Sequence, residues 1–124
     1  MEDKKILMNT YTGRVFNPLE MVPDNVAIED IAHALSMMCR GNGHLRFFYS
    51  VGLHSINCAQ EAIARGYQTG TVLACLLHDA TEAYIADLIR PVKNQLPEYE
   101  IMENNLFEVI KEKFFLQHLE EKEW

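Results

Sequence analysis

Helical spacing of apolar residues and helix-capping residues predict an all-α domain of about four to five helices. Residues 26–39, 51–64 and 98–116 each carry apolar residues at helical spacing. A fourth stretch, residues 71–87, begins as an almost unbroken apolar run, which is typical of a helix buried on all sides. The 124 residues fit a single domain, and a hydrophobic content of 48% suffices for a compact core.

The N-terminal part contains two short extended segments within residues 5–18, which form either a small β-hairpin or an irregular lead-in. A loop with two prolines follows at residues 18–25, and Asp24 or Asn25 can cap the first helix, which runs to about Cys39. The apolar face of this helix is expected at Ile28, Ile31, Ala32, Leu35 and Met38.

A break in the helical pattern at residues 40–48 gathers three basic side chains, Arg40, His44 and Arg46. Glycines in this stretch give the backbone conformational freedom. Composition alone favours a solvated loop and a phosphate-binding loop equally.

The second helix, residues 51–64, has Ser50 as its expected N-cap. If it forms an antiparallel pair with a helix over residues 71–86, the two helices are joined near residue 68. His54 and His78 then differ by four residues in distance from the joint, or about 6 Å of helix rise, which helix packing permits. The two imidazoles are therefore expected to meet across the pair.

His78 and Asp79 stand side by side after the apolar run, where burying ionisable groups is costly unless they are paired or bind metal. Together with His54 they could hold one ion. Glu82 lies one turn further on and shares their face. The alternative is a buried His–Asp pair that only stabilises a helical core.

The C-terminal part is expected to hold a loop over residues 88–97 and a last helix, with Pro97 in its first turn. This helix has an apolar stripe that we interpret as core: Met102, Leu106, Val109, Ile110 and Phe114. The charged tail is expected to be solvated at His118, Glu120, Glu121 and Glu123.

The formal net charge of −7 repels polyanions, so extended nucleic-acid binding is not expected, although a local basic cluster could still bind a small phosphate ester. The chain lacks a run of about 18 apolar residues and a leader-like N-terminus, so we expect a cytoplasmic protein with no membrane partner. No CxxC pair is present, and we interpret the cysteines as small buried hydrophobes in a reducing compartment, in preference to a metal or redox role: Cys39, Cys58 and Cys75.

The stretches TYTGRVFNP, IEDIAHALSMMCRGNGH, FYSVGLHS and LLHDATEAYIADLIRPVK resemble the HD-domain metal-dependent phosphohydrolase superfamily, in a nucleotidase-like branch of bacteria and phages. The likeness covers residues 11–115. It implies an all-α HD-type bundle in which His54, His78 and Asp79 bind a divalent metal ion. Manganese, cobalt, iron, nickel, zinc and magnesium remain open as its identity.

The resemblance also implies roles for neighbouring side chains. Glu82 and Asp87 would take part in catalysis. The groups expected to face phosphate are Arg46, His44, Arg40 and Lys93. The last metal-binding Asp of the superfamily has no counterpart, because no Asp follows Asp87. We therefore expect a C-terminally shortened domain over residues 1–124, whose three-residue site is completed by water, by another chain, or by Glu120, Glu121 or Glu123.

The function expected from this resemblance is hydrolysis of a small phosphate ester, a nucleoside monophosphate first of all. One alternative keeps the metal and changes the substrate to a cyclic or pyrophosphorylated nucleotide. Another is an HD-like metal- or nucleotide-binding module that has lost activity. Self-association as a homo-oligomer is an expectation from family analogy.

Overall fold

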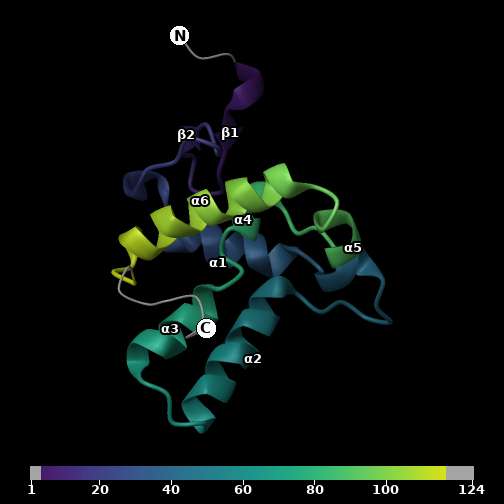
Figure 1. Cartoon of the computed structure of the whole chain (residues 1–124), viewed down its shortest axis with the longest axis vertical. Coiled ribbons are helices and arrows are strands. Elements are labelled where there is room, and N and C mark those ends of the chain that lie inside the picture. The colour runs from purple at the N-terminus through teal and green to yellow at the C-terminus, as the bar shows by residue number, and fades with distance from the viewer. Residues whose placement is uncertain (1–3, 117–124) are drawn as a thin grey trace.

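The computed structural model describes residues 4–116 as a helical assembly with one small hairpin (Figure 1). The all-α prediction with an N-terminal hairpin is confirmed. The predictions for His118, Glu120, Glu121 and Glu123 lie outside the described residues. The α-helices are α1 (Ile28–Met37), α2 (Val51–Ala64), α3 (Thr69–Leu77), α4 (Glu82–Ile85), α5 (Arg90–Lys93) and α6 (Pro97–Lys113). Within residues 4–116, no helix combines the length and apolarity that a membrane crossing requires.

The N-terminal segment begins with a short 3-10 turn, η1 (Lys4–Ile6), and continues into an antiparallel hairpin of β1 (Met8–Asn9) and β2 (Val15–Phe16). The buried Asp30 of α1 anchors the tip of this hairpin. Its carboxylate accepts hydrogen bonds from the backbone amide and the hydroxyl of Thr12, at 2.8 and 3.1 Å. The hairpin is therefore a docked part of the bundle and not an irregular lead-in.

Helix α1 begins later than the sequence predicted. The residues proposed as caps, Asp24 and Asn25, lie in a separate 3-10 turn, η2 (Pro23–Asn25), which the Asn25 side chain closes by accepting a hydrogen bond from the Val22 amide at 3.0 Å. The N-cap position of α1 is Ala27, which makes no side-chain capping bond. On the predicted apolar face Ile31 and Leu35 are buried, whereas Ile28 and Ala32 are exposed and Met38 is half-buried.

Helices α2 and α3 run antiparallel and make the most extensive helix–helix contact among the described residues (Figure 1). The predicted cap of α2 is confirmed, because the Ser50 hydroxyl accepts a hydrogen bond from the Leu53 amide at 2.9 Å. A backbone bridge between Cys39 and Ser50 closes the loop that connects α1 to α2. Both ends of this loop therefore lie at the N-terminal end of α2, one helical turn before His54.

The prediction of one helix over residues 71–86 is wrong, because α3 ends at Leu77 and a turn separates it from α4. The carbonyl of Cys75, which a continuing helix would pair with the Asp79 amide, accepts a hydrogen bond from the His78 ring at 2.6 Å. The turn continues with tighter i to i+3 bonds, such as the Glu82 amide to the Asp79 carbonyl at 3.0 Å. Helix α3 is also less buried than predicted, since only Ala74 and Leu77 are fully buried along it.

Helix α4 is followed by Ala86, whose φ of 72° and ψ of 167° lie in a region that only glycine adopts without strain. The Tyr99 hydroxyl of α6 donates a hydrogen bond to the Ala86 carbonyl and so fixes this conformation. The expected loop over residues 88–97 contains the short helix α5. Helix α6 follows the predicted stripe, with Leu106 and Ile110 in the core.

Replacement of Ala86 by glycine is expected to stabilise the protein by about 1 kcal/mol. The substitution removes backbone strain of about 1–3 kcal/mol and adds a glycine entropy cost of about 0.5–1 kcal/mol. Thermal unfolding should show a Tm higher by a few degrees. The matched control, Ala83→Gly inside α4, should lower Tm, and an Ala86→Gly variant less stable than wild type would contradict the assignment of strain.

Candidate metal centre

Three of the residues singled out from the sequence come together where α2 faces the turn after α3. The rings of His54 and His78 meet edge to face, with centroids 5.3 Å apart. The Asp79 carboxylate oxygen Oδ2 lies 3.7 Å from Nε2 of His54 and 3.1 Å from Nε2 of His78. The expected meeting of the two imidazoles across the helix pair is confirmed, and it includes Asp79.

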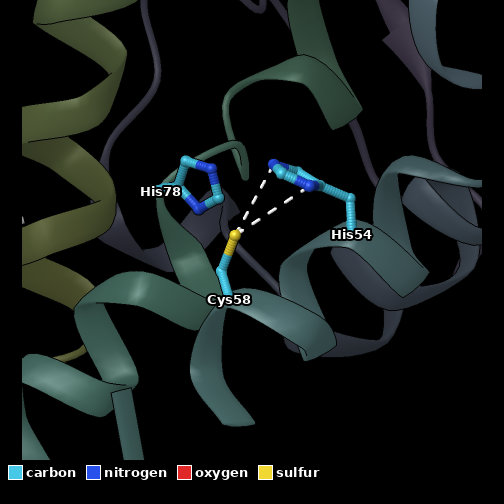
Figure 2. A group of neighbouring side chains, drawn as sticks. All are labelled: His54, Cys58 and His78. Carbon is cyan, nitrogen blue, oxygen red and sulfur yellow. Dashed lines mark hydrogen bonds between the residues drawn. The ribbon is translucent and has the colours of Figure 1, made fainter. Parts of the chain in front are cut away.

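Cys58 also belongs to this cluster and is half-buried, so the prediction that it is a buried hydrophobe is wrong. Its sulfur lies 3.6 Å from Nε2 of His54, one helical turn earlier on α2, and its side chain is half-buried. Figure 2 shows the thiol pointing between the two imidazole rings. Ligand atoms of His54, Cys58 and His78 all lie within 4.8 Å of one another, so this group could hold a metal ion. The His-x-x-x-Cys spacing on one helix face was the sequence signal that could have found it.

The hydrogen bond from His78 to the Cys75 carbonyl sets the chemistry of this ring. A carbonyl only accepts, so Nδ1 of His78 carries a proton, and Nε2 is the nitrogen that faces Oδ2 of Asp79 and the position of an ion. Imidazoles that bind metals are commonly oriented in this way by a backbone carbonyl. Two nitrogen or oxygen ligands about 2.0–2.2 Å from one ion lie about 3–4 Å apart, and the separations to Asp79 fall in this range.

The charges around the site favour a neutral His54 and an ionised Asp79. Burial and the positive charge of Arg40 lower the pKa of His54, with the His78 charge adding to them against the opposing effect of Asp79. The hydrogen bond to Asp79 raises the pKa of His78 against the effect of burial. Burial acts to raise the pKa of Asp79, but its hydrogen bonds and the nearby imidazoles lower it overall. A neutral His54 and an ionised Asp79 are the states that metal ligands need, whereas the proton that His78 shares with Asp79 must leave before this ring can bind an ion.

Glu82 contacts the same carboxylate from the start of α4. Burial raises the pKa of Glu82 to about 9, and the charge of Asp79 and the hydrogen bond between the two carboxyl groups act in the same direction. The neighbouring charges of Asp87 and Glu103 raise it further. At neutral pH the Glu82 carboxyl is thus protonated and donates its hydrogen bond to Asp79.

Asp87 follows the strained Ala86 and is half-buried. Its charge raises the pKa of both Glu82 and Tyr99, which places it on the same side of the bundle as the cluster. The structure therefore brings the expected catalytic pair, Glu82 and Asp87, into one electrostatic group beside Asp79.

The predicted basic residues divide into two groups. Arg40 and Arg46 line a hollow of about 480 Å³ together with Gly41, Leu45, Phe47 and Tyr49. Arg40 also lies close enough to His54 to lower its pKa, and His44 is exposed in the same loop. Lys93 is instead paired with Glu103 at 2.6 Å, so the structure provides it with a carboxylate partner within the protein.

Comparison with known proteins gives relatives of unassigned function. No protein-family model matches the sequence. The chain is 39% identical over 109 residues to the uncharacterized protein YfdR of Escherichia coli, covering 88% of this chain and 58% of that protein. It is also 39% identical over 95 residues to an uncharacterized protein of Rhodobacter capsulatus, covering 73% and 48%. The chain thus spans about half the length of these curated relatives.

The raised pKa of Glu82 predicts a pH-dependent stabilisation by Glu82→Gln in the metal-free protein. Between about pH 4.5 and 9 the unfolded chain releases this proton while the folded chain retains it, so wild-type stability falls as pH rises through this window. The substitution removes this loss. The gain in the free energy of unfolding of Glu82→Gln over wild type should be close to zero near pH 4.5 and at least about 1 kcal/mol near pH 8.

Thermal unfolding with a chelator present, at several pH values, measures this difference. Glu100→Gln on the exposed first turn of α6 is the matched control and should show no such trend. A stability difference between Glu82→Gln and wild type that stays constant from pH 4.5 to 8 would contradict the buried, protonated state of Glu82.

Proposed function

We propose that this protein is an HD-type, metal-dependent phosphohydrolase that acts on a small phosphate ester, with a nucleoside monophosphate as the first candidate substrate. The observation that carries the proposal is the approach of His54, His78 and Asp79 to within 3.7 Å through one shared carboxylate oxygen. These are the residues that the resemblance to the superfamily designates as metal ligands. A structural His–Asp pair would need neither the second imidazole nor a half-exposed position.

A divalent ion would be held by His54, His78 and Asp79, and when bound it supplies an acidified water and a Lewis acid for the phosphoryl oxygens. Two imidazoles and a carboxylate suit manganese, iron, cobalt, nickel or zinc, and magnesium is a further candidate. The metal-binding measurements described below distinguish among these ions.

Glu82 would orient and deprotonate the attacking water. Burial is the largest cause of its retained proton, and the nearby negative charge of Asp79 is the next. With a cation held by Asp79, this charge would be offset and the pKa of Glu82 would fall toward its ordinary range. The Glu82 carboxylate then becomes available as a general base beside the ligands.

Asp87 and the loop of residues 40–48, which carries Arg40, His44 and Arg46, would bind the rest of the substrate. Asp87 is held next to Glu82 by the fixed backbone of Ala86, where it can accept a hydrogen bond from a sugar hydroxyl or pass a proton to the leaving oxygen. Arg40 and Arg46 would supply positive charge for the phosphate, and His44 would face it from the same loop. Lys93 can contribute only if its pairing with Glu103 opens.

Metal binding should depend on the two histidines. The apo protein is expected to bind one equivalent of a divalent ion from the set above, measured by calorimetry and elemental analysis. His54→Ala or His78→Ala should weaken binding by at least about 100-fold, because each removes a direct ligand. His33→Ala, whose ring stacks on Tyr11 at 3.7 Å elsewhere on the protein, should bind as wild type does. Equal affinity in all three variants would exclude this site.

Phosphate release from a panel of nucleoside monophosphates, cyclic nucleotides and nucleoside diphosphates, with added manganese or cobalt, tests the reaction itself. Glu82→Gln should lower kcat by about 10²–10⁴-fold while the metal stays bound, since it removes a general base and not a ligand. Glu100→Gln is the control. Stoichiometric metal binding without any release of phosphate would contradict hydrolysis and favour a binding module.

A further inference from the structure

We propose that Cys58 is a direct ligand of the same ion, so that the site is a mixed set of two imidazoles, one carboxylate and one thiolate that selects zinc or cobalt over manganese or magnesium. The inference rests on the metal site of the proposed function and specifies which ions it holds. It adds a residue that the resemblance to the superfamily does not designate.

The position of the sulfur fits a shared ion. In a tetrahedral site with a metal–sulfur bond of about 2.3 Å and a metal–nitrogen bond of about 2.0–2.1 Å, sulfur and nitrogen lie about 3.6 Å apart. The Cys58 sulfur is 3.6 Å from Nε2 and 3.9 Å from Nδ1 of His54, so it lies beside the ring, and the His54 side chain must turn to aim Nε2 at an ion shared with the sulfur. The same geometry places nitrogen and oxygen ligands about 3.4 Å apart, and Asp79 lies 3.7 and 3.1 Å from the two imidazoles.

The surroundings of Cys58 are those of a ligand and not of a core side chain. Cys58 is a free thiol on the half-exposed face of α2, whereas its helix neighbours Ala59 and Ala62 are buried in the packed interior. Figure 2 shows its sulfur directed between the two imidazole rings. The i, i+4 spacing from His54 keeps both donors on one rigid helix face, so the two are arranged before any ion arrives.

Binding through sulfur requires no oxidant or reductant. The Cys58 thiol gives its proton to solvent, and a sulfur lone pair forms the bond to the cation. Thiolate is a soft ligand that favours zinc and cobalt, whereas magnesium and manganese favour oxygen donors. With Asp79 and a thiolate present, the charge of a divalent ion is balanced within the site.

Cobalt titration of the full apo chain under reducing, oxygen-free conditions tests the inference by absorption spectroscopy. Wild type should bind one equivalent and develop a near-ultraviolet sulfur-to-cobalt charge-transfer band. Cys39→Ser, which removes another free and half-buried cysteine, should retain the band. Cys58→Ser should bind cobalt without it, and its zinc affinity should fall by about 10–100-fold while its manganese affinity changes little.

Alkylation provides a second measurement that does not depend on how the variants fold. In wild type, zinc should slow the modification of Cys58 by iodoacetamide, followed by peptide mass, and should leave the modification of Cys39 unchanged.

Cobalt bound stoichiometrically without the charge-transfer band, or zinc bound without protection of Cys58, would overturn the proposal while leaving the phosphohydrolase site intact. Binding of manganese with no binding of cobalt or zinc would overturn this proposal alone, and failure to bind any of these divalent ions would overturn both proposals.

Discussion

The hydrogen bond from the His78 ring to the Cys75 carbonyl is the interaction on which the arrangement of the site depends. It occupies a carbonyl that the next turn of helix would need, so α3 ends at Leu77 and the chain turns. The same bond leaves Nε2 as the nitrogen of His78 that faces Asp79. One contact therefore ends the helix, orients the imidazole toward α2 and places Asp79 between the two histidines.

The turn also concentrates negative charge at one end of the bundle. Burial raises the pKa of Glu82, and Asp79, Asp87 and Glu103 lie close enough to raise it further, so that Glu82 keeps its proton. Lys93 offsets part of this charge through Glu103, and Arg40 contributes from the other side. Bringing these groups together costs stability, and the strained backbone of Ala86 adds to that cost. Features of this kind cluster at functional sites, and a bound cation would compensate the charge.

Sequence reasoning located the helices and the meeting of His54 with His78, because both follow from local periodicity and the length of the α2–α3 connection. It placed the cap of α1 wrongly, since Asn25 closes its own 3-10 turn, and it missed the break after Leu77. That break depends on a side chain bonding to a backbone carbonyl, which periodicity does not record. Cys58 was treated as core for the same reason, because a thiol and a small apolar side chain fit the same helical pattern. The pairing of Lys93 with Glu103 joins α5 to α6 and could not be read from either segment alone.

The most direct test of the account is anomalous diffraction from crystals grown with zinc or manganese. If these three side chains bind the ion, one anomalous peak is expected at about 2.0–2.3 Å from Nε2 of His54, Nε2 of His78 and Oδ2 of Asp79. A well-ordered crystal with a metal peak elsewhere and none between these three side chains would contradict it.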